Sequence, residues 1–182
     1  MRTPRSVSPV IAGVFRWRDA ALVRVPRPAA DWVRDPASLT HRLRARGAFS
    51  VLPLEQSIQP PRPDERRLLG QQPRQWALIR EVLLQLDGRP VVYARSVLPL
   101  SSLRGGNRRL AHMTRRSLGA ELFRAPAAKR RAVWLARVPG DALPAETRAT
   151  GPVWGRQSLF LKRHAPLLVA EFFLPALWDV GG

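Results

Sequence analysis

The stretch "WALIREVLLQLDGRPVVYARSVLPL", residues 76–100, is rich in apolar and β-branched residues on both sides of an Asp87-Gly88 pair. Aspartate followed by glycine is typical of the two-residue turn that joins antiparallel strands, because both turn positions need a positive φ. Short apolar runs bounded by such a turn indicate strands rather than helices. We therefore predict a β-hairpin whose strands cover residues 75–86 and 91–100.

Four further runs have the length and composition of strands. A second hairpin is expected near the C-terminus, where "RHAP" (163–166) separates two of these runs. The four runs are residues 48–56, 131–138, 151–162 and 167–175. Together with the first hairpin they predict an antiparallel β-sheet of about six strands.

Helical signals lie between the strands. Residues 35–47 should form a short helix, because Asp35 can cap its start and Gly47 can end it. Residues 66–72 can add a helical turn. Residues 101–130 also read as helical, with a break at "RGGN" (104–107). Helices segregated against an antiparallel sheet define an α+β fold.

The chain has 182 residues, which is the usual length of a single domain. Residues 1–27 are rich in Arg and Pro, and we expect them to be extended or loosely ordered. Residues 28–182 should form one domain with its own core.

Composition excludes several kinds of site. The chain has no Cys, so it forms neither disulfides nor thiolate metal sites. The three histidines, His41, His112 and His164, are far apart in sequence, and no metal site or cofactor is expected. No apolar run is long enough to span a bilayer, and the N-terminus is a poor match to a signal peptide. We expect a soluble, cytoplasmic protein.

The net charge of +18 admits two interpretations. Nearly all of the basic residues are Arg, which is consistent with coding bias and a solvated basic surface. A basic surface can also attract an anionic partner, either nucleic acid or an acidic small molecule. The charge is densest over residues 101–140, but no zinc finger, RNA-recognition signature or helix-turn-helix accompanies it. Charge alone does not predict a nucleic-acid partner.

Three predicted strands carry one charged residue each on an apolar face: Arg80, Arg95 and Glu171. Burial of an unpaired charge is strongly unfavourable. One explanation is a buried salt bridge between Arg80 and Glu171, and another is that one of these faces is exposed. A third is a pocket for a small ring, in which an Arg holds a carboxylate and Glu171 accepts a hydroxyl hydrogen bond.

Four segments resemble the chorismate lyase family in content, order and spacing. The resemblance extends from Trp76 to Pro175, is weaker over residues 28–75 and is absent from the first two dozen. The segments are "WALIREVLLQLDGRPVVYARSVLPLSSL" (76–103), "SLGAELF" (117–123), "GPVWGRQSLFLK" (151–162) and "PLLVAEFFLP" (166–175).

The resemblance implies an activity and a site. The family cleaves chorismate into 4-hydroxybenzoate and pyruvate for ubiquinone biosynthesis, without a metal or cofactor, in a buried site under helical flaps. Matched to the family motifs, Arg80 would bind the ring carboxylate with help from the backbone amide of Leu118. Glu171 would face the ring hydroxyl, and Leu39 would stand where the family can have a Met that makes a backbone contact.

The remaining residues and partners are expectations of our own. Arg95 should meet the enolpyruvyl carboxylate. Tyr93 and Arg156 can support the site from behind these residues, but core packing and a surface charge are the favoured interpretations. We expect a monomer that binds chorismate and 4-hydroxybenzoate. The alternatives are a non-catalytic domain that senses a small aromatic acid, as in transcription regulators of related fold, and a basic nucleic-acid-binding protein. A regulator usually carries a separate DNA-binding domain, for which the segment before residue 28 is too short.

Overall fold

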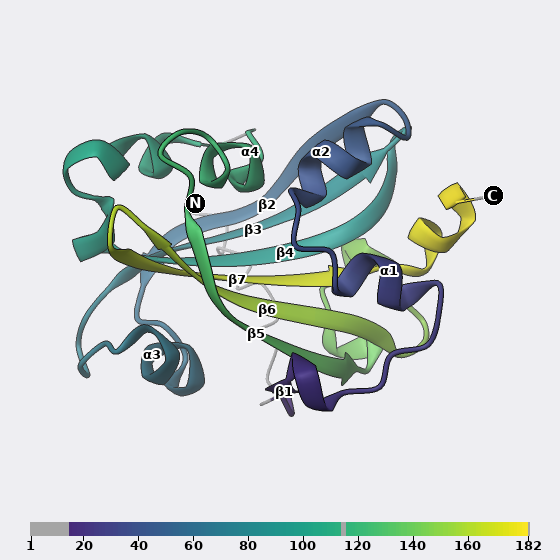
Figure 1. Cartoon of the computed structure of the whole chain (residues 1–182), viewed down its shortest axis with the longest axis horizontal. Helices are drawn as coiled ribbons and strands as arrows, with labels where there is room; N and C mark the ends of the chain where they lie inside the picture. The colour runs from purple at the N-terminus through teal and green to yellow at the C-terminus, as the bar shows by residue number, and fades with distance from the viewer. Residues whose placement is uncertain (1–14, 114–115, 182) are drawn as a thin grey trace, which may run out of the picture.

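In the computed structural model, which describes residues 15–113 and 116–181, seven antiparallel strands form a single sheet (Figure 1). The order across the sheet is β1-β5-β6-β7-β4-β3-β2. The strands are β1 (Arg18–Asp19), β2 (Phe49–Gln59), β3 (Ala77–Leu86), β4 (Arg89–Pro99), β5 (Lys129–Val138), β6 (Val153–Lys162) and β7 (Ala165–Phe173). The α+β class is confirmed, and β1 is the strand beyond the six expected.

Both predicted hairpins are present, and together they form the centre of the sheet. Asp87 and Gly88 have φ values of 50° and 76°, so the first turn has the left-handed backbone that an Asp-Gly pair favours. Arg163 and His164 also have positive φ, at 51° and 66°, and they form the turn between β6 and β7. Because β7 pairs with β4, the two hairpins are joined edge to edge.

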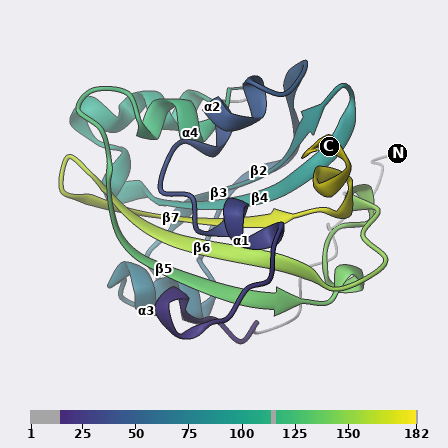
Figure 2. The same cartoon turned by 45° about the vertical axis from the view of Figure 1, so that its right-hand side comes forward.

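The helices cover the two faces of the sheet unequally. Helices α1, α2 and α4 lie over one face, whereas α3 lies on the other (Figures 1 and 2). We call the face below α2 and α4 the pocket face. The α-helices are α1 (Ala29–Val33), α2 (Leu39–Arg44), α3 (Pro63–Leu69) and α4 (Leu118–Leu122), and the 3-10 helices are η1 (Ala20–Leu22), η2 (Leu100–Leu103), η3 (Gly105–His112), η4 (Gly140–Ala142), η5 (Ala145–Thr147) and η6 (Pro175–Gly181).

The predicted start of the helix over residues 35–47 is wrong. Helix α2 begins at Leu39, and its N-cap is Ser38, whose side chain accepts a hydrogen bond from the His41 amide at 3.3 Å. Asp35 accepts instead from the amide of Ala37 at 2.8 Å. The Asp35 side chain therefore organises the turn that precedes the helix, because its short carboxylate bonds most readily two residues onward.

The region between the hairpins is less helical than expected. It consists of η2, η3 and the five-residue helix α4, and strand β5 already begins at Lys129. Gly105 has a φ of 56° at the predicted "RGGN" break between η2 and η3. None of the helices in the described ranges is both long and apolar enough to cross a membrane.

Part of the N-terminal segment packs on the sheet. Residues 1–14 lie outside the described residues. Beyond them, the rings of Phe15 and Trp17 approach the ring of Phe172 to 5.7 and 6.0 Å between centroids. Strand β1 pairs with β5, with Arg18 opposite Leu135.

Apolar side chains fill both faces of the central strands, so the charges buried among them stand out. Arg80, Arg95 and Arg156 are 2%, 7% and 1% exposed, respectively. Arginine is almost never fully buried unless it is paired. These three arginines therefore mark places where a buried charge needs an ion-pair partner or a ligand.

Candidate active site

A pocket lies between the pocket face of the sheet and helices α2 and α4. Most of its wall is apolar, and a few polar groups converge on it, as is usual for small-molecule sites. The lining residues are Leu39, Thr40, Arg80, Val82, Leu84, Ala94, Ser96, Ser117, Leu118, Gly119, Leu122, Phe123, Arg130, Phe160, Val169 and Glu171.

Small side chains on β4 form the floor of the pocket. Ala94 pairs with Val82 on β3 and with Glu171 on β7, while Ser96 pairs with Arg80 and with Val169. Residues directly opposite each other in an antiparallel pair point to the same face. The larger neighbours therefore surround Ala94 and Ser96, and the short side chains in the middle leave room for a ligand.

Arg80 lies at one end of this floor, on β3. Its side chain is buried, and Nη2 donates a hydrogen bond to the carbonyl of Arg116 at 2.5 Å. Burial lowers the pKa of the Arg80 guanidinium, because removal from water disfavours the cation. Ser117 and Leu118, which follow Arg116, also line the pocket. Arg80 is therefore next to the segment that enters α4.

Glu171 lies across the floor on β7 and is held by Arg156 from β6. Arg156 Nε donates to Glu171 Oε2 at 2.7 Å, and Nη2 is also 2.7 Å from the same oxygen. Arg156 is directly opposite Glu171 in the register and is 1% exposed. The interpretation of Arg156 as a surface charge is therefore wrong. The alternative of a solvent-exposed face for Arg80 or Glu171 is also wrong, because Arg80 is 2% exposed, the Glu171 side chain is 13% exposed and both line the pocket.

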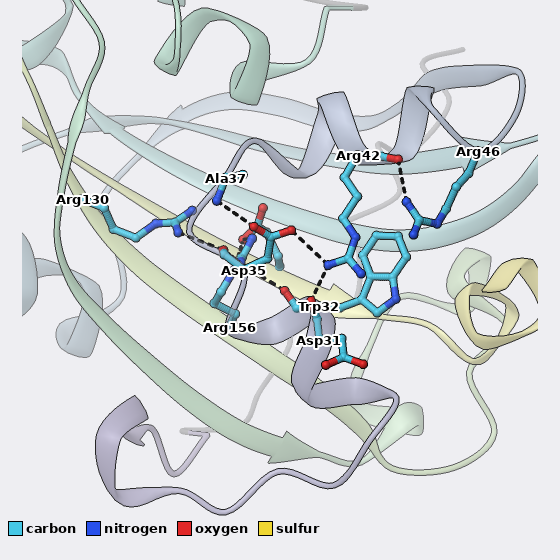
Figure 3. Close-up of polar contacts among 9 residues, drawn as sticks. Asp31, Trp32, Asp35, Ala37, Arg42, Arg46, Arg130 and Arg156 are labelled. Carbon is cyan, nitrogen blue, oxygen red and sulfur yellow. Dashed lines mark hydrogen bonds and ion pairs between the residues drawn. The ribbon is translucent and has the colours of Figure 1, made fainter.

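The end of α1 and the connection from α1 to α2 lie against Arg156 (Figure 3). Arg156 Nη1 donates to the carbonyls of Trp32 at 3.3 Å and of Asp35 at 2.8 Å. Arg42 pairs with the Asp35 carboxylate at 3.0 Å, and its guanidinium lies over the Trp32 ring at 3.8 Å. The backbone of this connection therefore satisfies the donors of Arg156 that do not face Glu171.

Leu39 and Leu118 both line the pocket, from α2 and α4. The hydroxyls of Thr40 and Ser117 are hydrogen-bonded to each other and join the two helices. Gly119 is adjacent, and a Cβ at this position would approach Thr40 Oγ1 to 2.7 Å. The two helices are thus in contact over the pocket, at the position where the resemblance implied flaps.

The prediction that Arg95 meets the enolpyruvyl carboxylate is wrong, because its side chain lies on the face of the sheet opposite the pocket. Ala94 and Ser96 face the pocket, so Arg95 between them points to the opposite face of the sheet. There it pairs with Glu65 of α3 at 2.7 Å and with Glu81 of β3 at 2.7 Å. Burial opposes the ionisation of Glu65, but the hydrogen bonds and charge of Arg95 outweigh it and lower the pKa of this carboxyl. Arg95 therefore anchors α3 and does not line the pocket.

Tyr93 is on that opposite face too, and its interpretation as core packing is confirmed. Its side chain is fully buried and stacks on Phe172, with 5.5 Å between the ring centroids. Burial raises the pKa of the Tyr93 hydroxyl far above its usual value. Within the described ranges, no three His, Asp or Glu side chains are grouped so that they could hold a metal ion.

Sequence reasoning missed Arg130 and favoured a surface position for Arg156, whereas the structure places Arg130 in the pocket wall and Arg156 against Glu171. Arg130 was part of the basic run "AAKRRA", where nothing in the pattern separates a pocket residue from a surface charge. Arg156 did leave a signal. A two-residue turn at Arg163 and His164 sets the register of β6 and β7, and that register puts Arg156 opposite Glu171.

Comparison with known proteins gives the same family that the motifs resemble. A protein from Alcanivorax borkumensis named "Probable chorismate pyruvate-lyase" is 54% identical over 163 residues, which cover 90% of this chain and 77% of that protein. A protein of the same name from Azoarcus sp. (strain BH72) is 45% identical over 171 residues, which cover 86% of this chain and 90% of that protein.

Solved structures of low identity share the fold. The effector domain of PhnF from Mycobacterium smegmatis superposes with a TM-score of 0.61 at 18% identity, covering 77% of this chain and 90% of that domain. At this identity the likeness concerns the fold alone. The family model described as "Chorismate lyase" matches residues 13–181, a range that contains the whole pocket. With that match and these relatives, the chain belongs to the chorismate lyase family.

Proposed function

We propose that this chain removes pyruvate from chorismate and leaves 4-hydroxybenzoate, with Arg80 and Glu171 at the two ends of the bound ring. The observation that supports this most directly is that a buried cation, Arg80, and a largely buried carboxylate, Glu171, line the same mostly apolar pocket. The ring of the substrate carries a carboxylate at one end and a hydroxyl at the other. Arg80 is suited to the carboxylate and Glu171 to the hydroxyl.

The spacing of the strands suits a single six-membered ring. Arg80 is on β3 and Glu171 on β7, with β4 between them. Two strand spacings place the backbones of β3 and β7 about 10 Å apart. Arg80 and Glu171 therefore stand on either side of Ala94 and Ser96 on the same face of the sheet, a separation that suits a ring bound at both ends.

At the carboxylate end, the start of α4 supports Arg80. Leu118 is the first residue of α4, and the first amides of a helix have no acceptor within the helix. The Leu118 amide is therefore suited to donate to the ring carboxylate next to the Arg80 guanidinium. Leu39, at the start of α2, also lines the pocket and would offer the backbone contact expected there.

At the hydroxyl end, Arg156 orients the Glu171 carboxylate. Both of its contacts are to Oε2. In this orientation Oε1 is the oxygen that can accept a hydrogen bond from the ring hydroxyl. We assign Glu171 this role, and also the transfer of the proton that the ring carbon bearing the hydroxyl must lose.

The reaction needs positioning more than it needs a nucleophile. The bond between the ether oxygen and its ring carbon breaks, and the adjacent carbon that bears the hydroxyl loses its hydrogen. The ring becomes aromatic, and the enolpyruvate that leaves takes up a proton to become pyruvate. Because aromatisation drives the step, an enzyme gains most by holding both ends of the ring and by stabilising the developing charge.

The test is to mix the purified chain with chorismate and to follow 4-hydroxybenzoate and pyruvate together. We expect equal amounts of both products, and a loss of roughly 100-fold or more in kcat/KM for Arg80→Ala and for Glu171→Ala. Binding of 4-hydroxybenzoate without turnover would contradict the lyase and favour the sensing domain. The absence of both turnover and binding would contradict each of these functions.

A further inference from the structure

Chorismate carries a second carboxylate, on the enolpyruvyl group that leaves. The question of which residue binds it depends on the proposed function. The ether is attached to the ring carbon next to the one that bears the hydroxyl. When Glu171 binds that hydroxyl, the enolpyruvyl carboxylate must lie beside Glu171 rather than beside Arg80. Arg95 cannot reach this place, because it is on the other face of the sheet.

Arg130 is brought to this part of the pocket by an irregularity in strand β5. The register between β5 and β6 shifts between Arg130 and Ala132, so that Arg131 is the additional residue of a β-bulge. Arg130 is opposite Phe160, which lines the pocket, whereas Arg131 is exposed. Bulges of this kind commonly redirect one side chain next to a functional site.

The guanidinium of Arg130 reaches the Arg156–Glu171 pair. Arg130 Nη1 donates to the carbonyl of Asp35 at 3.2 Å, and Arg156 donates to the same oxygen at 2.8 Å (Figure 3). The two guanidinium groups therefore share one acceptor. Since Arg156 is also bound to Glu171, Arg130 lies at the hydroxyl end of the pocket.

Arg130 has donor capacity that the described residues do not use. Its Nε is buried and has no hydrogen-bond partner among them, and none of their carboxylates forms an ion pair with it. Its guanidinium lies over the Phe160 ring, 5.0 Å from the centroid. Burial, followed by the nearby charge of Arg156, lowers the pKa of Arg130. A carboxylate bound here would hydrogen-bond the buried Arg130 guanidinium and would offset the repulsion between Arg130 and Arg156.

From this geometry we propose that Arg130 binds the enolpyruvyl carboxylate and thereby distinguishes chorismate from 4-hydroxybenzoate. The substrate engages Arg80 and Arg130 at once, through its two carboxylates. The aromatic product keeps the carboxylate at Arg80 and loses the one at Arg130. Arg130 thus adds binding energy for the substrate and for the leaving group, and adds none for the aromatic product.

The test compares Arg130→Met with Arg131→Met. Methionine keeps much of the apolar stem that packs on Phe160, and Arg131 is an exposed neighbour of equal charge. For Arg130→Met we expect kcat/KM for chorismate to fall roughly 10- to 100-fold, the loss expected for a charged hydrogen bond, mainly through a higher KM. The inhibition constant of 4-hydroxybenzoate should change less than about threefold. Arg131→Met should leave both quantities unchanged.

Arg130→Lys keeps the charge but not the planar fork, and its effect should be intermediate. It also replaces the Met variant if that variant does not fold, as judged by thermal unfolding. An equal loss of affinity for chorismate and for 4-hydroxybenzoate would overturn the assignment, and so would an unchanged KM. Wild-type protein that does not turn chorismate over would instead refute the proposed function on which the assignment rests.

Discussion

Two small residues, Ala94 and Ser96, determine how much space the pocket has above the sheet. Both are nearly buried, at 7% and 3% exposure, and both are surrounded by larger side chains. In a core without a ligand, such positions would be filled to native packing density. Their small size therefore supports the interpretation that the space above them is kept for the ring.

A larger side chain at position 94 should weaken ligand binding more than it weakens the folded state. We expect Ala94→Val to reduce 4-hydroxybenzoate affinity by roughly 10-fold or more, because two methyl groups would occupy the volume that the ring needs. The folded state should lose less than about 2 kcal/mol, since the added methyls enter a pocket rather than a filled core. Isothermal calorimetry and urea unfolding measure the two effects. A large loss of stability with unchanged affinity would contradict the role of Ala94 as the pocket floor.

The Arg156–Glu171 pair predicts a non-additive stability effect. Arg156→Met leaves the Glu171 carboxylate, which is 13% exposed, without its ion-pair partner, and this should destabilise the fold by about 3 kcal/mol. In the double variant Arg156→Met, Glu171→Gln, the unpaired charge is gone, and the loss should be smaller. Urea unfolding of the two single variants and the double variant measures this coupling. Additive losses would mean that the two side chains do not act as a pair.

At the scale of elements, the site depends on how two hairpins meet. Hairpin β3–β4 supplies Arg80 and the pocket floor, and hairpin β6–β7 supplies Arg156 and Glu171. A shift of one residue in the β4–β7 pairing would turn Glu171 to the other face. The turns at Asp87-Gly88 and at Arg163-His164 set the register within each hairpin, and the β4–β7 pairing sets the register between them.

Lys162 fixes helix α4 over the pocket. This lysine is at the end of β6 and is 4% exposed. Its Nζ donates to the carbonyls of Glu121, Arg124 and Pro126 at 2.8, 2.9 and 3.0 Å. Burial lowers the pKa of the ammonium, and the three carbonyls hold it in place. The end of α4 is thus attached to the sheet at one point.

The only other lysine in the chain, Lys129, is exposed and serves as a control. Lys162→Met should lower the free energy of unfolding by about 2 kcal/mol, because a charged donor to three carbonyls is lost. It should also speed the release of 4-hydroxybenzoate, since α4 is then free to lift from the pocket. Stopped-flow fluorescence and urea unfolding measure the two effects. If Lys129→Met has equal effects, the contact of Lys162 with α4 is not their cause.

The attachment of α3 through Arg95 predicts a pH dependence of stability. The folded-state pKa of Glu65 is lowered, so its stabilising contribution is present above the unfolded value of about 4.3. This contribution is lost as the pH falls through the lower folded value. Glu65→Gln should therefore be less stable than wild type at pH 7, by about 1–3 kcal/mol, and the difference should shrink as the pH falls below the unfolded value of about 4.3.

Unfolding in urea at several pH values tests this prediction, and Glu146→Gln provides an exposed control. A difference between wild type and Glu65→Gln that persists unchanged at pH 3 would show that the carboxylate charge is not its cause.

At the scale of the whole molecule, the charge of +18 bears on how an anion reaches the pocket. A dianionic substrate is attracted by the whole basic surface, and this long-range attraction is screened by salt. If association limits kcat/KM, we expect kcat/KM for chorismate to fall several-fold between 20 and 300 mM NaCl, while kcat stays nearly constant. Steady-state kinetics over this range measures it.

The outcome also bears on the nucleic-acid alternative. A salt-dependent affinity for DNA or RNA that is unchanged in Arg80→Ala would support a second role for the basic surface. Kinetics of chorismate cleavage that do not depend on salt would mean that the charge is not used for steering.

Local pattern was sufficient to predict six of the seven strands described, both hairpins and two charged residues that line the pocket. Alternating apolar residues and an Asp-Gly turn are short-range signals, so β3, β4, β6 and β7 could be located from sequence alone. A charge on an apolar strand marked Arg80 and Glu171, because such a residue requires a partner or a ligand. The start of α2 was misplaced, since Asp35 and Ser38 are both good caps and only packing selects between them.

Which face each side chain takes was decided by the tertiary structure. Arg80 and Arg95 carried the same signal, yet one lines the pocket and the other binds α3, because the face of a strand that receives each helix depends on long-range packing. Arg130 gave no signal at all, since a β-bulge turns it inward and its acceptor on Asp35 is 95 residues away. Sequence determined which segments are strands and which charges need a partner. Only the folded sheet determined which of them meet, because pairing between distant strands is a property of the whole chain.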